Sequence, residues 1–306
     1  MTRKESIQRA RKLIFSNKLS AFGAITVAVF LGLALSFFVT RGGISPYNPS
    51  TINLNPSSQN LLPSAAHLFG TDNLGRDIFS RVLAALPIDL SLPIAIVFLS
   101  AVIGILFGTI AGYLGGFIEE VIMRLTDMFL AFPTLIMALA VAATLGPSLL
   151  NVTLSLVFVW WPPYVRLVRG GVLGVKSEDY MAVSRSLNSS FPYILRKGLL
   201  PNILPSVLVY ASLDIGTALL SVSSLGFLNV GIPTGTPELG AMVNLITQNI
   251  LYTYPWEALI PAFIVLLIVL GFSLFGDGIR EAGDVKVRPH MLIKSRVLGG
   301  LAPKEN

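Results

Sequence analysis

Residues 90–118 read LSLPIAIVFLSAVIGILFGTIAGYLGGFI and contain no Asp, Glu, Lys or Arg. A helix that crosses the hydrocarbon core of a bilayer needs about 20 consecutive apolar residues. In lipid every backbone amide must be paired within the protein, and a helix satisfies its own amides. This stretch therefore predicts a membrane-spanning helix.

The same pattern recurs along the chain. Residues 19–40, 128–165 and 258–276 are also uncharged, and residues 198–237 hold a single charge, Asp214. The stretch 128–165 is too long for one helix, and we expect a break at residues 146–148, where Gly, Pro and Ser follow each other. The fold prediction is an all-α membrane protein with six transmembrane helices, at about residues 19–40, 90–113, 124–145, 149–166, 205–228 and 256–276.

The composition excludes several other classes of protein. Hydrophobic residues make up 53% of the chain and charged residues 12%, against about 25% charged in an average soluble domain. The mean hydropathy is +0.74. A soluble enzyme, a fibrous protein and a disordered chain are excluded on these grounds. The sequence has no Cys, which excludes disulfides and thiolate metal sites.

The 22 Lys and Arg residues are distributed unevenly. They gather before the first predicted helix, between the fourth and fifth, and after the last, whereas only Arg41, Arg76 and Arg81 fall on the opposite side. Because cytoplasmic loops carry the excess of positive charge, both termini are predicted in the cytoplasm. The net charge of +6 then reports orientation, and no nucleic-acid partner is expected.

The predicted organisation follows from these spans. A basic cytoplasmic tail at 1–18 precedes the first transmembrane helix at 19–40, and an extracytoplasmic segment at 41–89 is expected to be irregular. A five-helix core at 90–280 contains a cytoplasmic loop at 170–204. A second cytoplasmic tail occupies 281–306.

Motifs for enzymatic chemistry are absent from the sequence. Residues 171–177 approach a phosphate-binding loop but have the wrong spacing. His67 and His290 are predicted on opposite sides of the membrane, so they cannot share a metal. We therefore predict that the chain is not an enzyme and binds no metal or cofactor itself.

The loop at 170–204 is longer than a simple connection between helices requires. Ser177 is predicted to cap a short helix that runs to Leu187, and Asn188 suits the left-handed residue that ends it. A second helix, with Phe191 and Pro192 in its first turn, is expected to end before Pro201.

Leu187, Phe191 and Tyr193 would then be exposed apolar side chains at the membrane surface. They suggest a docking surface for a soluble partner. The alternative is a loop that folds back on its own bundle or on lipid headgroups.

At this loop the sequence resembles a known family. Asp179-Tyr180-Met181-Ala182-Val183-Ser184-Arg185-Ser186-Leu187-Asn188, followed by Leu200-Pro201-Asn202, is similar to the EAA loop of binding-protein-dependent ABC importer permeases. Other segments resemble the second permease of the dipeptide/oligopeptide/nickel branch, in the same order: FGTDNLGRD at 69–77, RLTD at 124–127 with AFP at 131–133, WPPYVRLVR at 161–169, TPELGAM at 236–242 and GDGIR at 276–280.

The resemblance implies the type I ABC importer permease fold in the cytoplasmic membrane of a prokaryote. It implies as partners a second homologous permease, two ATPase subunits that bind ATP and Mg, an extracytoplasmic substrate-binding protein and membrane lipid. The segment 179–192 would couple this chain to the ATPases. The coupling residues would be Asp179, Ala182, Val183, Ser184, Arg185, Leu187, Asn188, Phe191 and Pro192.

Two levels of function stay open at this point. Within the family, di- and oligopeptides are the leading substrates, and oligosaccharides or nickel are alternatives. Outside it, a secondary transporter or a channel subunit would also be a multi-span membrane protein. We see no internal repeat of the kind that secondary transporters show.

Several residues outside the loop attract attention. Asp214 is an ionisable residue inside a span, and it either lines the translocation path or pairs with the second permease. Asp72, Arg76 and Asp77 either contact an external partner or cap their own loop. Trp160 is interpreted as an anchor at the membrane interface. Gly104, Gly108 and Gly112 form a small-residue face that predicts close helix packing, within the chain or with the second permease.

Overall fold

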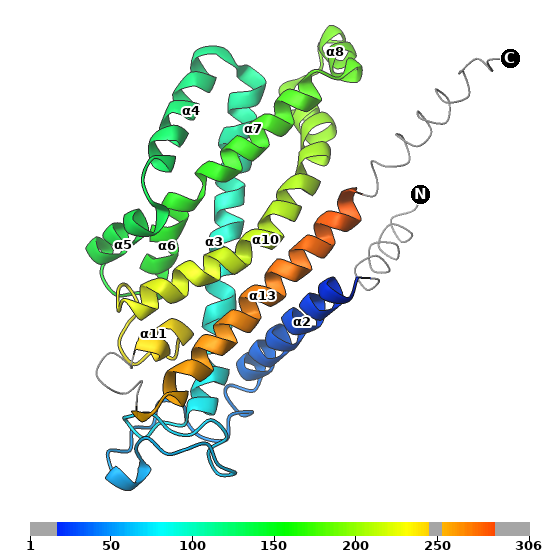
Figure 1. Cartoon of the computed structure of the whole chain (residues 1–306). Coiled ribbons are helices and arrows are strands. Elements are labelled where there is room, and N and C mark those ends of the chain that lie inside the picture. Colours follow the sequence, from blue (N-terminus) through cyan, green and yellow to red (C-terminus); the bar gives the residue numbers. More distant parts are fainter. Residues whose placement is uncertain (1–16, 245–252, 285–306) are drawn as a thin grey trace, which may run out of the picture.

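The computed structural model describes residues 17–244 and 253–284, and within them the chain is helical and has no strand (Figure 1). An isolated β-bridge joins Thr71 and Asp77. The tails predicted at 1–18 and 281–306, together with His290, lie outside the described residues except for 17–18 and 281–284.

The helices follow one another in a simple order. They are α2 (Lys18–Val39), the 3-10 turn η1 (Pro56–Ser58), α3 (Ile78–Leu114), α4 (Gly116–Leu130), α5 (Thr134–Leu145), α6 (Leu149–Trp160), α7 (Pro162–Lys176), α8 (Asp179–Ser186), α9 (Phe191–Tyr193), the π-helical turn η2 (Ile194–Leu199), α10 (Leu200–Phe227), α11 (Leu239–Asn244) and α13 (Trp256–Asp284).

Four helical runs of the described chain are long and apolar enough to cross a membrane: Lys18–Val39, Ile78–Leu114, Phe191–Phe227 and Trp256–Glu281. They correspond to the first, second, fifth and sixth predicted spans. The second begins earlier than predicted, because residues 78–89, assigned to the irregular external segment, are helical. The charged side chains of this added helical part, Arg81 and Asp89, are buried, with 3% and 0% exposure.

The third predicted span, 124–145, is wrong as a single straight helix. It consists of α4 and α5, which meet at an angle of 87°. Pro133 precedes α5 directly; proline lacks an amide hydrogen and restricts the residue before it, which favours a break or a bend at this point. Counting this bent pair as one span gives up to five spans among the described residues, and the predicted six stay a prediction.

The fourth predicted span, 149–166, is also divided. The expected break at residues 146–148 is confirmed, since α5 ends at Leu145 and α6 begins at Leu149. However, α6 ends at Trp160 and α7 begins at Pro162. Pro162 and Pro163 supply no amide hydrogens, so the ladder of helical hydrogen bonds is interrupted there.

The centre of the molecule is the contact between α3 and α7. A methyl group added to Gly108 would lie 2.7 Å from Cβ of Val168, and one added to Gly112 would lie 2.8 Å from Cβ of Val172. Val168 and Val172 are fully buried. The glycine face therefore serves close packing within this chain, which settles the alternative left open by the sequence.

Two groups of connecting segments lie at opposite ends of the bundle (Figure 1). The turn between α3 and α4 and the helix α8 lie at one end, and residues 41–77 with α11 lie at the other. At the side of the bundle the start of α2 meets the end of α13, where Nδ2 of Asn17 donates a hydrogen bond to Oε2 of Glu281 over 3.3 Å. The described ends of the chain are thus close together.

Candidate functional site

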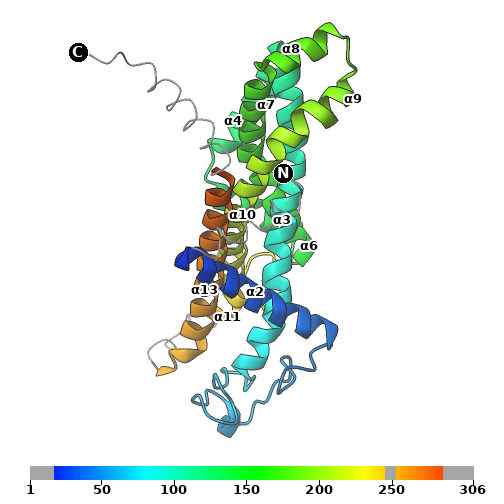
Figure 2. The same cartoon turned by 90° about the vertical axis from the view of Figure 1, so that its right-hand side faces the viewer.

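The segment between α7 and α10 forms an elbow at one end of the bundle, made of α8, α9 and the turn between them (Figure 2). The predicted short helix is present as α8, and Asn188 has φ of 57°, which confirms the left-handed turn. The predicted cap is wrong. Ser177 ends α7, and its hydroxyl donates to the carbonyl of Gly174 over 2.7 Å. Glu178 instead offers the first carbonyl of α8, which accepts the Met181 amide at 3.0 Å.

The second predicted helix of the elbow does not end before Pro201. Phe191 and Pro192 form its first turn as expected, but the helix continues through η2 into α10. Pro201 lies in the first turn of α10, directly after the π-helical turn. Because η2 already departs from the regular hydrogen-bond pattern, the missing amide hydrogen of this proline need not break the helix.

One face of the elbow is exposed and apolar. Leu187 is 74% exposed and Val183 58% exposed, whereas Met181, between them and the core, is only 1% exposed. The other predicted coupling residues share the exposed side or border it: Asp179, Ala182, Asn188, Phe191 and Pro192 are exposed and Ser184 is half-buried. Arg185 belongs to α8, but its side chain lies outside the described part of the structure.

The elbow is held firmly to the bundle. Asn202 of α10 donates from Nδ2 to the hydroxyl of Tyr180 at 3.1 Å. Nζ of Lys176 donates to the carbonyl of Tyr113 at 2.9 Å, and the ring of Tyr113 packs on that of Phe191 with centroids 4.9 Å apart. These contacts lie where the elbow meets the ends of α3, α7 and α10.

Two ion pairs fix α4 against α7 near the same end. Arg166 donates to Oδ1 of Asp127 at 2.6 Å, and Nε of Arg169 donates to Oε1 of Glu119 at 2.6 Å. Both acidic residues lie in α4 and both arginines in α7. The first pair is about half exposed and adds little stability by itself.

The external residues predicted as possible partner contacts are buried in their own loop. Asp72, Arg76 and Asp77 are 2%, 5% and 4% exposed. Asp72 accepts from Nε of Arg76 at 2.7 Å, and Asp77 caps α3 by accepting the Ser80 amide at 2.8 Å. His67 contacts Asp77 over 2.8 Å. This geometry favours the alternative in which these residues cap their own loop and do not contact an external partner.

A pair of buried carboxyls near the same end was not anticipated as a site. Asp89 of α3 and Glu238 before α11 are both fully buried. Oδ2 of Asp89 accepts the Leu239 amide at 3.0 Å, and Glu238 accepts the Gly240 and Ala241 amides at 2.9 and 2.6 Å. Burial raises the pKa of the Glu238 carboxyl, which also interacts with Asp89. No sequence pattern links two residues so far apart.

Asp214 has its hydrogen-bond partners within this chain. Its Oδ2 accepts from Nε1 of Trp160 at 2.7 Å and from the hydroxyl of Tyr164 at 2.8 Å. Trp160 is 8% exposed and ends α6 beside the break to α7, so its interpretation as a membrane-interface anchor is wrong. The indole of Trp160 is a donor inside the molecule.

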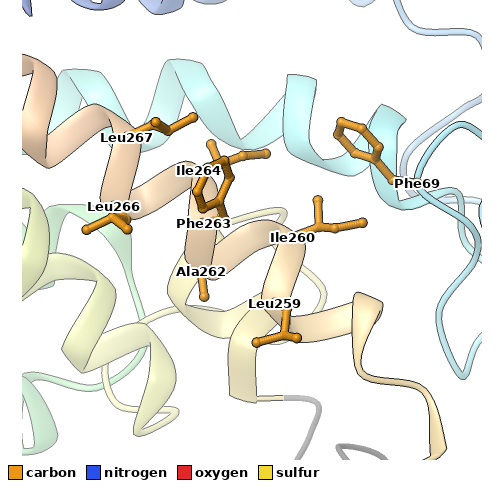
Figure 3. A pocket seen from close by; sticks show the side chains of 8 residues that line it. All are labelled: Phe69, Leu259, Ile260, Ala262, Phe263, Ile264, Leu266 and Leu267. Carbon is orange, nitrogen blue, oxygen red and sulfur yellow. The ribbon is translucent and has the colours of Figure 1, made fainter.

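A cavity of about 740 Å³ lies along α13, and its lining is apolar (Figure 3). Phe69 and residues of α13 line it, and all of them are apolar: Leu259, Ile260, Ala262, Phe263, Ile264, Leu266 and Leu267. It offers no side-chain hydrogen-bond donor or acceptor to a polar ligand. It is suited to lipid tails or to apolar side chains of a neighbouring subunit.

The described chain thus combines several helices that could span a membrane with an exposed elbow at one end. Residues 104–289 match the family described as "Binding-protein-dependent transport system inner membrane component". The chain belongs to this family, whose members are permeases and not enzymes.

Curated relatives match most of the chain. It is 38% identical over 262 residues to the "probable D,D-dipeptide transport system permease protein" of Escherichia coli (strain K12), covering 86% of this chain and 87% of that protein. It is 36% identical to the dipeptide transport system permease protein of Alkalihalophilus pseudofirmus, covering 92% and 90%. It is 38% identical to the glutathione transport system permease protein of Escherichia coli O157:H7, covering 87% of both.

Among solved structures, an amino acid ABC transporter with histidines is similar with a TM-score of 0.47 and 18% identity, covering 65% of this chain and 92% of that chain.

Proposed function

We propose that the chain is one half of the translocation pathway of an ATP-driven importer and that the elbow, residues 179–192, couples it to cytosolic ATPases. The observation that carries this proposal is the exposed apolar face of Leu187 and Val183 on a helix anchored by buried Met181. Exposed apolar side chains on a rigidly held helix are suited to a cleft in a partner protein. This exposure disfavours the alternative that the elbow folds back on its own bundle, whereas the alternative that it lies on lipid headgroups is left to the copurification test below.

The coupling is mechanical in this proposal. The elbow connects α7 to α10 and contacts the end of α3, so a rigid-body shift of α8 would move all three helices. The sequence has no nucleotide-binding loop, and we place ATP and Mg on the partner ATPases and no cofactor on this chain.

The proposed complex contains this chain, a second homologous permease, two ATPase subunits and an extracytoplasmic binding protein. Six spans with both termini in the cytoplasm, as in type I importer permeases, agree with the distribution of Lys and Arg. The elbow then lies in the cytoplasm and the loop at residues 41–77 outside. A secondary transporter or channel subunit has no need of such an elbow.

Di- or oligopeptides are the proposed substrates. The relatives' names contain D,D-dipeptide, dipeptide and glutathione, and all of these compounds are small peptides. Oligosaccharides and nickel are the second choice. Uptake of labelled peptides into vesicles that contain the complete complex, compared with sugars and Ni²⁺, tests this choice.

The change Leu187→Glu tests the coupling proposal. At 74% exposure the side chain supports nothing within this chain, so the variant should fold, yet it should lose ATPase copurification and uptake. Leu62→Glu, at a leucine 66% exposed in the loop at the opposite end, is the matched control and should retain the ATPases. Unchanged copurification and unchanged uptake in Leu187→Glu would refute the assignment.

A further inference from the structure

Asp214 is the one charged residue of α10 and lies halfway along it. Its Oδ2 receives two hydrogen bonds, from Trp160 at the end of α6 and from Tyr164 in α7. Two donors on one oxygen hold the carboxylate in a fixed orientation. Its position inside a candidate span makes this an expensive place for a charge.

The charge of Asp214 is not balanced by its neighbours. Its two partners are neutral donors, and among the described residues no ion pair joins it to a Lys, Arg or His. Oδ1 receives no hydrogen bond from a described residue, and the side chain is only half-buried. A carboxylate in this state is stabilised when a cation reaches the free oxygen.

The surroundings favour an organic cation. The rings of Tyr164 and Tyr210 pack edge to face with centroids 5.0 Å apart, and Tyr210 is partly exposed beside the carboxylate. Aromatic rings attract ammonium groups through their faces. Among the described residues, no group of three His, Cys, Asp or Glu side chains could hold a metal ion. A neutral sugar would leave the charge unbalanced.

We propose that Asp214 and Tyr210 form a transient binding site for a primary ammonium group of the transported molecule. Every peptide with a free N-terminus carries such a group, so the inference rests on the proposed function and deepens it. Asp214 and Tyr210 lie in α10, and Tyr164, whose ring packs on that of Tyr210, lies in α7.

Uptake by the complete importer in proteoliposomes is the first test. Asp214→Asn keeps one oxygen that can accept from Trp160 and Tyr164 and replaces the other oxygen by a neutral NH2 group, so the charge is removed. We expect peptide uptake to fall about tenfold or more, as for the loss of a hydrogen bond between charged groups. Asp214→Glu should retain most uptake, and ATPase copurification should be unchanged in both. Equal uptake by Asp214→Asn and the wild type would overturn the inference.

A second measurement reports the local charge even where uptake is lost for another reason. Because the sequence has no Cys, Thr217→Cys provides a single thiol at an exposed position one turn from Asp214. Cationic and anionic thiosulfonate reagents are compared in the assembled complex. We expect the cationic reagent to react faster, and Asp214→Asn to abolish this preference while leaving the rates at Leu62→Cys unchanged.

Failures of the two proposals can be told apart. Absence of peptide uptake by the wild-type complex contradicts the proposed function. Normal wild-type uptake with no charge preference at Thr217→Cys contradicts only the ammonium site. A thiol that reacts in the isolated chain but with neither reagent in the complex would place Asp214 against the second permease and also overturn the site.

Discussion

Asp89 and Glu238 are two carboxyls that are buried together. Asp89 is fully buried in α3, where it accepts the Leu239 amide at 3.0 Å. Two adjacent buried carboxyls cannot both be ionised cheaply, so the pair is expected to hold one proton. That proton, and not a counter-charge, makes the site compatible with the interior.

The first prediction concerns this pair. Asp89→Asn keeps an acceptor for Leu239 and adds a donor toward Glu238, so it should retain the thermal stability of the purified complex. Asp89→Leu removes the acceptor and leaves buried groups unpaired, at a cost of about 1–3 kcal/mol per group. Equal unfolding temperatures for the two variants would contradict this account of the pair.

The pH dependence follows from the same pair. Because the pKa of Glu238 is raised in the folded state, the folded chain holds a proton that the unfolded chain releases. Its stabilising contribution is therefore present at low pH and is lost as the pH rises through the folded pKa. Thermal melts across pH should show this fall in the wild type, and Glu238→Gln, which removes the titrating carboxyl, should flatten it.

The hydrogen bond from Tyr164 to Asp214 leads to a prediction about stability. Tyr164→Phe removes one of two donors to a carboxylate and should cost about 1.5–3 kcal/mol, the range for hydrogen bonds to charged groups. Tyr193→Phe is the matched control, since that residue is 55% exposed in the elbow. If thermal unfolding shows equal losses in the two variants, the hydrogen bond to Asp214 contributes nothing to stability.

At the scale of whole helices, α3 and α7 pack so closely that an added side-chain carbon would be crowded. A Cβ at Gly108 would lie 2.7 Å from both the carbonyl oxygen of Val165 and Cβ of Val168. Gly108→Ala should therefore destabilise the chain by about 1–3 kcal/mol through overpacking. Gly174→Ala in α7, where a Cβ would meet nothing within 4 Å, should be neutral or stabilising. Comparing the unfolding temperatures of the two variants tests the packing directly.

Helix ends show where prediction from sequence succeeded and failed. The break at residues 146–148 could be predicted because Gly146 and Pro147 adjoin, and Gly146 has φ of 81°. The bend at Pro133 and the break at Pro162 were not predicted, whereas Pro87, Pro93, Pro205 and Pro261 lie inside helices that continue. Proline alone therefore does not decide whether a helix ends, because the freed backbone groups can be satisfied by neighbouring helices that a local pattern does not reveal.

The candidate sites also divide into those that could be predicted from the sequence and those that could not. The elbow could be predicted because its signals, such as Asn188, are local and lie within a few residues of each other. The partners of Asp214 lie 50 and 54 residues away in the chain, at Tyr164 and Trp160. For Asp72 and Arg76 the sequence left open whether they contact an external partner or cap their own loop, and the structure shows that they pair with each other in the interior.

For the whole molecule, the proposed function depends on which end of the bundle faces the cytoplasm. The elbow and the loop at residues 41–77 lie at opposite ends (Figure 1), and 19 of the 22 Lys and Arg are predicted on the side of the elbow. The positive-inside rule assigns that side to the cytoplasm. The absence of Cys from the sequence allows this to be tested with single thiols in an otherwise native chain.

Leu62→Cys and Leu187→Cys place thiols at exposed positions of the two ends. In intact cells a membrane-impermeant maleimide should label Leu62→Cys, and it should label Leu187→Cys only after the membrane is permeabilised. The same result with and without the ATPase subunits would show that the orientation belongs to this chain alone. Labelling of Leu187→Cys from outside would put the elbow out of reach of any cytosolic ATPase, and the coupling proposal would fail even if the complex transports peptides.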